Sequence, residues 1–369
     1  MSPTSFSQSS YRFTHVGMDV HRDSISVAVL PPQLEVPEVD KVFHDEPSIR
    51  RVFTTLGDPR LLRACYEAGP TGYGVQRLLA SMGVRCDVVA PSLIPHAAGD
   101  RVKTDKRDAR RLARLHRMGE LTPIRVPSVA EEGVRDLCRA REDAIEDRRR
   151  ARQRLGGMLL RHGRVYRDGT AWTMKHHAWL ESQRFEDRAV QATYARYVAT
   201  VSVRDADVAA IEADLLGWFD SELFHDRCSR LAAYRGIDRL GALVLASEIC
   251  DWRRFESAHR HMAFCGLVPT EYSSGNHTRR GHLTKAGNVQ VRRQLIESAW
   301  AYQHPARLTK HIAARHEGVH PDTVARAWKA QQRLCRRFRQ LAARKDSRNV
   351  VVAAVARELA GFLWAEMTA

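Results

Sequence analysis

The N-terminal third of the chain alternates short apolar segments of strand character with segments of helical character. The first two strand-like segments, His15–Val20 and Ser24–Leu30, are separated by a polar triplet, as in a β-hairpin. In chain order we expect strands over 15–20, 24–30 and 41–44, a helix over 48–56, a strand over 61–67, a helix over 75–82, a strand over 85–90 and a helix that begins near residue 105. This βββαβαβα order predicts an α/β layer with a mixed sheet.

Acidic residues occupy strand positions and the last helix of this region. Asp19 lies inside the first strand, where an unpaired carboxylate is costly, and Glu67 ends a later strand. Asp105 and Asp108 are three residues apart, so both project from one face of a helix. Five basic residues surround this pair: Lys103, Lys106, Arg107, Arg110 and Arg111.

Two interpretations fit the acidic pair. Carboxylates hold divalent cations and basic side chains hold a polyanion, so the segment suits metal-dependent phosphodiester chemistry. Alternatively, Thr104 is the N-cap of an ordinary solvated helix, and Asp105 is favourably placed near the helix dipole. This segment alone favours the ordinary helix, and other parts of the chain must decide between the two.

The charge of the chain points to a polyanionic partner. There are 59 Lys and Arg residues against 43 Asp and Glu residues, which gives a net charge of +16. Nucleic acid is the leading candidate for that partner. A length of 369 residues predicts two or three domains.

Cysteine and histidine patterns argue against a structural metal site. The seven cysteines are scattered and never spaced as CxxC, which predicts buried, reduced thiols in a cytoplasmic protein and no disulfide framework. Two histidine groups, His176-His177 and His259-Arg260-His261, lack neighbouring acids or cysteines at ligand spacing. We therefore do not expect them to bind metal.

Neither end of the chain predicts a membrane segment. Residues 1–13 are rich in serine and lack the apolar core of a secretory signal, so we expect a disordered tail. The longest apolar run, 350–364, is interrupted by Arg357 and Glu358. It is expected to be a packed helix and not a membrane span.

A long helix is expected over Val134–Leu155, because this charged segment contains neither Gly nor Pro and spaces its apolar residues helically. A second helix near 205–218 is expected to pair with it as a coiled-coil spacer. One face of the first helix is basic and carries Arg148, Arg149, Arg150, Arg152 and Arg154. That face is either solvated or in contact with nucleic acid.

The C-terminal half contains two segments with possible phosphate contacts. Residues 231–242 resemble a helix-hairpin-helix, although Asp238 stands where the second hairpin glycine is usual. The stretch 271–288 is polar, basic and punctuated by glycine, so we expect a loop that follows a phosphate backbone. A hydroxyl there is a candidate nucleophile, but the simpler interpretation is that Ser273 and Ser274 hydrogen-bond phosphates. Amphipathic helices over 289–302 and 321–343, the second with a basic face, close the chain.

Six short motifs together resemble one protein family. The N-terminal ones are Gly17-x-Asp19, Glu67-Ala68-x-x-Thr71-Gly72 and Lys103-Thr104-Asp105-x-x-Asp108-Ala109. The C-terminal ones are Phe264-x-Gly266-Leu267-x-Pro269, Tyr272-x-Ser274-Gly275 and Lys285-Ala286-Gly287-Asn288 followed by Arg292-Arg293. In this order they resemble the DEDD transposases of the insertion-sequence one-ten family, relatives of the Piv invertase. The resemblance covers residues 14–110 and 230–300, and the departures are Asp238 and a longer basic tail.

The resemblance implies an architecture of four parts. It implies a disordered tail over 1–13, an RNase H-like (RuvC-like) DEDD domain over 14–125, a helical coiled-coil spacer over 126–225 and a mainly helical transposase domain over 226–369, which carries a catalytic serine loop and basic C-terminal helices. The implied activity is that of a site-specific DNA recombinase. Its expected partners are donor and target DNA, a structured bridge RNA that chooses them, and further copies of the chain in a dimer or tetramer.

The resemblance also implies roles for individual residues. Asp19, Glu67, Asp105 and Asp108 would bind Mg²⁺ or Mn²⁺, two ions in all, and Ser274 would attack the scissile phosphate. Nucleic acid would contact Lys103, Arg107, Arg148, Arg149, Arg150, Arg279, Arg280, Lys285, Arg292 and Arg293. Two alternatives stay open: a structure-selective nuclease that uses the four acids and water, and a basic nucleic-acid-binding regulator without activity.

Overall fold

The computed structural model describes residues 12–91, 94–95, 104–274 and 277–369. The chain forms two compact units, Met1–Val126 and Pro127–Ala369. The expected tail over 1–13 lies outside the described residues except for its last two positions.

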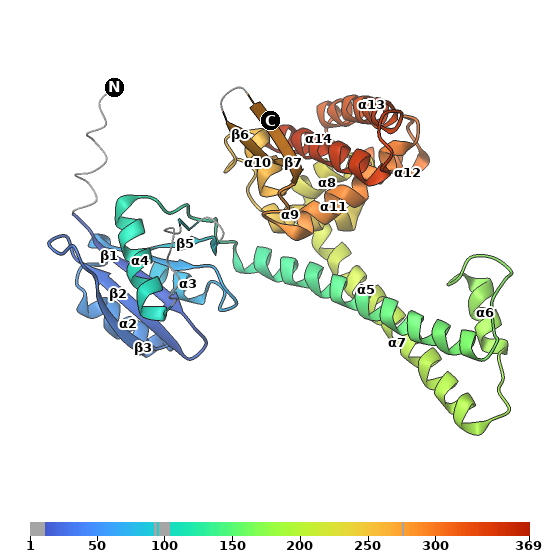
Figure 1. Cartoon of the computed structure of the whole chain (residues 1–369), viewed down its shortest axis with the longest axis horizontal. Helices are drawn as coiled ribbons and strands as arrows, with labels where there is room; N and C mark the ends of the chain where they lie inside the picture. The colour runs from blue at the N-terminus through green and yellow to red at the C-terminus, as the bar shows by residue number, and fades with distance from the viewer. Residues whose placement is uncertain (1–11, 92–93, 96–103, 275–276) are drawn as a thin grey trace. The chain divides into compact units, whose positions relative to one another are not determined.

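Unit 1 is a five-stranded sheet with helices on both faces, which confirms the α/β prediction (Figure 1). The strand order is β3-β2-β1-β4-β5, and the sheet is mixed because β1 pairs antiparallel with β2 but parallel with β4. The strands are β1 (Thr14–Val20), β2 (Ser24–Leu30), β3 (Glu38–Phe43), β4 (Leu62–Glu67) and β5 (Arg85–Val89). The helices are α2 (Glu46–Thr55), the short 3₁₀ helix η1 (Pro59–Leu61), α3 (Gly74–Ser81) and α4 (Asp105–Met118).

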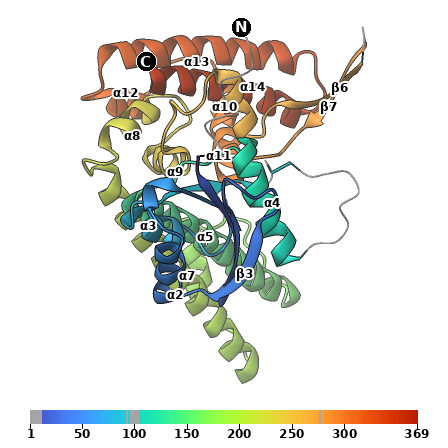
Figure 2. The ribbon, with the colours of Figure 1, turned by 90° about the vertical axis from the view of Figure 1, so that its left-hand side faces the viewer.

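The alternation of side chains along the strands divides this sheet into two different faces. One face is a large apolar core in which Val16, Met18 and Tyr66 pack against α2 and α3. The other face is lined with small residues, and α4 covers it by packing Ala109 and Ala113 against Ala28. Figure 2 shows α4 on one side of the strands and α2 and α3 on the other.

Helix α4 lies unusually close to β1, because the strand carries a glycine where the helix crosses it. A Cβ atom at Gly17 would overlap the carbonyl oxygen of Ala109 and the amide nitrogen of Ala113. Two residues earlier, Nδ1 of His15 lies 3.4 Å from Nδ1 of His116 near the end of the helix. The helix therefore runs antiparallel to β1, and its first turn points toward the residues that follow Gly17.

Unit 2 begins with two long helices, α5 (Val129–Arg161) and α7 (Arg188–Phe219), which run side by side in Figure 1 with α6 (Met174–Ser182) at their far end. Arg141 pairs with Glu212 and Arg152 with Asp205, so the two helices are antiparallel. Both are longer than predicted. Helix α5 continues through Gly156 and Gly157, and α7 begins earlier because Tyr194 and Val201 are buried against α5 in spite of the low helix propensity of nearby β-branched residues.

The rest of unit 2 is a helical body with one β-hairpin. Its elements are α8 (His225–Ala232), α9 (Arg239–Ile249), α10 (Ala258–Phe264), β6 (Pro269–Ser274), β7 (His277–Leu283), α11 (Val289–Trp300), the 3₁₀ helix η3 (Ala301–Gln303), α12 (Lys310–His316), α13 (Pro321–Ala342) and α14 (Arg348–Thr368). Helix α14 is buried in the core, as predicted for the apolar run 350–364. All seven cysteines are buried free thiols, which confirms the predicted burial.

One prediction for unit 2 is wrong. Residues 269–274 and 277–283 form two antiparallel strands and not a loop; the prediction failed because a polar hairpin lacks the apolar alternation that marks a strand. The predicted turn and apolar helix over 231–242 are present between α8 and α9; most of the turn is buried, but Asp238 is exposed. His316 donates to the carbonyl of Ala233 (3.0 Å), Arg315 donates to that of Ile237, and Asp238 accepts from the amide of Gly241 (2.7 Å) as the N-cap of α9.

None of the helices within the described residues is both long and apolar enough to cross a lipid bilayer.

Candidate functional site

Asp19 and Glu67 are placed on the same face of the sheet by strand geometry. Gly17 of β1 is paired with Cys65 of β4, and both lie on the face that α4 covers. Two residues further along each strand, Asp19 and Glu67 therefore follow on that face. Because β1 and β4 are parallel, both acids lie near the carboxyl ends of neighbouring strands.

The first turn of α4 brings a third acid to this edge. From Ala109 back to Asp105 is one helical turn, about 6 Å, and from Gly17 on to Asp19 is a similar length of strand. Thr104 begins the helix, since its hydroxyl accepts a hydrogen bond from the amide of Arg107 (3.4 Å). The N-cap interpretation of Thr104 is thus confirmed, and it is compatible with a functional role for Asp105.

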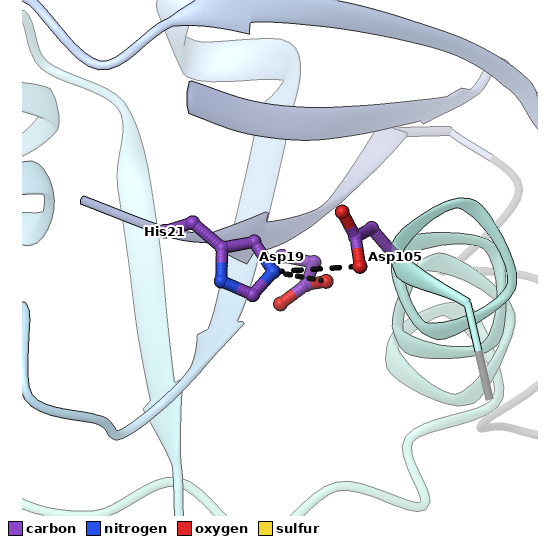
Figure 3. A group of neighbouring side chains, drawn as sticks. All are labelled: Asp19, His21 and Asp105. Carbon is purple, nitrogen blue, oxygen red and sulfur yellow. Dashed lines mark hydrogen bonds and ion pairs between the residues drawn. The ribbon is translucent and has the colours of Figure 1, made fainter. Parts of the chain in front are cut away.

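A histidine joins the two carboxylates (Figure 3). Nε2 of His21 lies 3.2 Å from Oδ2 of Asp19 and 3.5 Å from Oδ1 of Asp105. Nζ of Lys41 lies 3.9 Å from Oδ2 of Asp105. Strand pairing explains the position of Lys41. Asp19 is paired with Ser26 and Ser26 with Lys41, so the three residues form one row across the sheet.

The site raises the pKa of Asp19. Burial is the largest cause, since only 22% of this side chain is exposed and the charged form loses hydration. His21 opposes the shift by its charge and hydrogen bond, whereas the negative charges of Asp105 and Asp108 add to it. Asp108 is therefore near enough to be felt at Asp19, and an added cation would relieve the repulsion among these acids.

The donor set fits a metal ion. One oxygen or nitrogen atom each from Asp19, His21 and Asp105 all lie within 4.8 Å of one another, the one such group found among the described residues. Glu67 and Asp108 are outside that group, although both belong to the same edge of unit 1. The structure thus brings the carboxylates of Asp19 and Asp105 together. Asp108 is not in the group, but its negative charge contributes to the raised pKa of Asp19.

His21 and Lys41 are the site residues that sequence reasoning misses. His21 lies in the polar triplet between the first two predicted strands. Its spacing from Asp19 was a usable signal, because alternate positions of an extended chain share a face.

The second candidate region is the β6–β7 hairpin in unit 2. Ser274 is the last residue of β6 and is paired with His277; its side chain and Gly275 lie outside what the structure describes. Tyr272 is paired with Arg279, and both are exposed. Acids and serine therefore belong to different compact units.

The remaining C-terminal motifs lie just before β6 and just after β7, where the two ends of the hairpin meet. A Cβ atom at Gly266 would overlap the carbonyl oxygen of Ala286, and one at Gly287 would overlap that of Phe264. The amide of Asn288 donates to the carbonyl of Phe264 (3.0 Å), and its side-chain oxygen caps α11 by accepting from the amide of Val291 (3.0 Å). Two motifs about twenty residues apart are thus in direct backbone contact, and we call this contact between residues 264–266 and 286–288 the clasp.

The predicted nucleic-acid contacts fall into three groups. Lys103 lies outside the described residues, and the side chain of Arg280 is likewise not described. Arg107, Arg279 and Lys285 are exposed. The others make contacts within the chain: Arg148 with Asp205, Arg149 and Arg150 with Glu146, Arg292 with the carbonyl of Cys265, and Arg293 with Glu142.

The histidine groups do not gather with acids. His261 is buried, and its Nδ1 donates to the carbonyl of Ala360 (3.1 Å) while its ring packs on Trp252. His176 is buried among aromatic rings. Neither is in the metal-spaced group found within the described residues.

Known proteins resemble the chain along nearly its whole length. Two family models match it: a DEDD transposase of the IS110 type, described as a transposase, over residues 16–163, and the family described as transposase IS116/IS110/IS902, over residues 228–314. "Putative transposase y4qE" of Sinorhizobium fredii is 43% identical over 96% of the chain and 88% of that protein. The transposase for insertion sequence element IS1533 of Leptospira borgpetersenii is 33% identical over 89% of the chain and 97% of that protein. The chain therefore belongs to the IS110 family of DEDD transposases, which are enzymes that act on DNA.

Proposed function

We propose that this transposase is a site-specific recombinase that cuts and rejoins DNA strands with a metal site in unit 1 and Ser274 in unit 2. The observation that carries the proposal is the meeting of Asp19 and Asp105 at the end of β1. The two acids come from elements 86 residues apart in sequence, and their side chains are 22% and 48% exposed.

Asp19, Glu67, Asp105 and Asp108 would hold Mg²⁺ or Mn²⁺, two ions in all. These ions prefer carboxylate oxygens as ligands, and the pKa of Asp19, raised mainly by burial and further by the charges of Asp105 and Asp108, would be lowered by a bound cation. A bound divalent ion would supply charge neutralisation at the phosphate and help a hydroxyl to ionise. The acids themselves keep fixed positions, because α4 is held on β1 at Gly17.

Ser274 is proposed as the nucleophile. Its hydroxyl oxygen forms a bond to the scissile phosphorus, the bond from phosphorus to the departing sugar oxygen breaks, the serine proton is lost and the sugar oxygen takes one up. The bond energy is kept in a phosphoserine ester. Attack by another strand's hydroxyl then reverses the step and joins the strands without an external energy source.

The proposed partners are donor and target DNA, a structured bridge RNA, and further copies of the chain in a dimer or tetramer in the cytoplasm. Unit 1 is proposed to be RNase H-like (RuvC-like) over 14–125, with a coiled-coil spacer over 126–225 and the transposase domain over 226–369. The exposed side chains of Arg107, Arg279 and Lys285 support contact with a polyanion. Arg148, Arg149 and Arg150 remain candidates, although each also has an acidic partner within the chain.

A covalent adduct tests the proposal. Purified protein is incubated with element DNA, its flanking RNA and Mg²⁺, then denatured, and DNA-linked protein is measured. Ser274→Ala should bind DNA but give no adduct, whereas Ser273→Ala, its neighbour in β6, should keep substantial activity. An adduct from Ser274→Ala, or a dead Ser273→Ala, would exclude this assignment of the nucleophile.

The location of the acids and the serine in different units favours one alternative enough to test. The four acids of unit 1 would suffice, with water, for a structure-selective nuclease in which Ser274 only binds DNA. Cleavage without an adduct in wild type and in both serine variants would establish that function. Absence of any metal-dependent cleavage would point to a regulator.

A further inference from the structure

A cleft on the helical pair of unit 2 has features that the proposed chemistry does not use. It lies between α5 and the segment that leads into α6, and its volume is about 560 Å³, within the range of roughly 300–1,000 Å³ usual for ligand pockets. Arg148, Arg149 and Arg152 line it on the α5 side, and Trp172 and His176 on the other. Gly156 lines it as well.

Gly156 keeps the cleft open at a cost to the helix. It lies inside α5, where glycine is less favourable than alanine. A Cβ atom there would meet nothing within 4 Å. The close packing that explains Gly17, Gly266 and Gly287 is therefore absent at Gly156, and the open space lies in the cleft.

Trp172 is held in a conformation that large residues rarely adopt. Its φ is +67°, in the left-handed region, which is strained for a non-glycine residue. Its amide donates to Nδ1 of His176 (3.0 Å), and His176 is in turn packed against Tyr166 and Trp179. The indole is thus fixed at the wall of the cleft by a buried aromatic cluster.

Arginine side chains are oriented around the indole by carboxylates. Nη2 of Arg152 lies 2.6 Å from Oδ1 of Asp205, and Nη1 of Arg148 lies 3.8 Å from the same oxygen. Cζ of Arg152 is 4.5 Å from the centre of the Trp172 ring. A guanidinium has five N–H donors, so an arginine with one acidic partner keeps donors for a ligand.

We propose that this cleft binds one unpaired nucleotide of the nucleic-acid partner. Aromatic and guanidinium planes are surfaces on which splayed bases stack, and arginines beside them match the phosphate. A base inside a duplex must first be unpaired and unstacked to enter such a cleft, so a single strand should bind it more tightly. The inference rests on the proposed function only in taking nucleic acid as the partner, since it involves neither the acids nor Ser274.

Two glycines give a matched pair of variants. Gly156→Gln fills the cleft, whereas Gly157→Gln places the same side chain on the next residue of α5, which does not line it. Both changes replace a helix-interior glycine by a better helix former, so neither should unfold α5. Trp172→Ala removes the stacking surface, and Trp218→Ala on α7, 39% exposed and away from the cleft, is its control.

Binding is measured by fluorescence anisotropy with labelled ten-nucleotide oligouridine, oligothymidine and a ten-base-pair duplex. Gly156→Gln and Trp172→Ala should each weaken single-strand binding about tenfold and leave duplex binding unchanged, while both controls bind as wild type. Preference for oligouridine would identify RNA as the source of the nucleotide, and preference for oligothymidine would identify DNA.

Equal single-strand affinity for wild type, Gly156→Gln and Trp172→Ala would overturn the inference, as would equal losses on duplex. The Ser274 adduct is measured on the same preparations. If the wild-type protein forms the adduct but the cleft variants bind single strands as it does, the recombinase proposal stands and nucleotide binding in the cleft is refuted. Cleft-dependent binding without any adduct refutes the proposed function and keeps the cleft.

Discussion

The acid edge of unit 1 and the serine hairpin of unit 2 carry equally recognisable motifs, but these motifs do different work. At the acid edge, the motif residues Asp19 and Asp105 are partly exposed side chains whose carboxylates meet at His21. The packing there is done by Gly17, whose lack of a side chain lets α4 lie on β1. Chemistry and scaffold are thus divided between different residues of one motif.

In the hairpin region, most motif residues form the scaffold. Gly266 and Gly287 allow backbone contact, Asn288 caps α11, and Arg292 binds the carbonyl of Cys265. Ser274 is not part of the clasp and ends β6. Substitutions at the acid edge should therefore cost activity without stability, and substitutions in the clasp should cost stability first.

Asp19→Asn should give the largest effect and the cleanest test of that contrast. The amide removes a charged oxygen ligand, so metal-dependent cleavage should fall on the order of 10³-fold or more. Thermal stability of the metal-free protein should stay equal or rise, because repulsion among the acids is relieved. Asp23→Asn changes an exposed acid just beyond the site and should cleave normally. Loss of folding in Asp19→Asn would break the comparison.

Gly17→Ala should destroy the geometry of the acid edge without touching an acid. The new Cβ would overlap backbone atoms of Ala109 and Ala113, which cannot move aside as a side chain can, so α4 must shift. We expect a loss of about 1–3 kcal/mol in unfolding free energy together with a severe loss of cleavage. Gly74→Ala, where a Cβ would meet nothing within 4 Å, is the control. A variant with normal Mn²⁺ affinity would show that Gly17 does not position the acids.

Most of unit 1 could be predicted from sequence because its signals are local. Apolar alternation fixes the strands, and the spacing of Asp105 and Asp108 fixes a shared helix face. The site itself depends on α4 crossing β1 at Gly17, a long-range contact that no local pattern encodes. For that reason His21 and Lys41 were missed, since their roles appear only once strand pairing and the helix position are known.

Unit 2 was harder to predict for two physical reasons. The β6–β7 strands are polar, so they lack the alternation that marks a half-buried strand. Helix α7 is rich in Val and Thr in its first half, which lowers local helix propensity, and burial of Tyr194 and Val201 overrides that propensity. Family resemblance identified the serine motif, but it could not tell which of its residues hold the backbone.

Low pH should lower the unfolding free energy of unit 2 through protonation of His261. Burial, together with nearby Arg254, lowers the pKa of His261 to about 4, although its bond to the Ala360 carbonyl opposes the shift. The unfolded chain therefore binds more protons between about pH 6.5 and 4, and stability that is full above pH 6.5 is lost as pH falls through this window. We expect His261 to account for about 2–3 kcal/mol of the fall in unfolding free energy. His261→Gln should abolish this part of the fall, whereas the control His259→Gln, which changes an exposed neighbour, should keep it. Chemical denaturation across pH measures it, and identical slopes in the two variants would contradict the assignment.

Asn288→Ala should give the smallest effect and isolates the clasp. Its Oδ1 caps α11, and its Nδ2 donates to Oε2 of the buried Glu248 (2.7 Å), which Arg139 also binds. Loss of both bonds should cost about 1–2 kcal/mol. Asn288→Ser keeps a capping oxygen and loses only the bond to Glu248, so it should recover part of that loss. Ser347 begins α14 without a side-chain capping bond, so Ser347→Ala should be neutral.

Adduct formation per folded molecule should be unchanged in Asn288→Ala. If instead the adduct disappears while stability is kept, Asn288 belongs with the acids as a functional residue, and the division between the two regions does not hold.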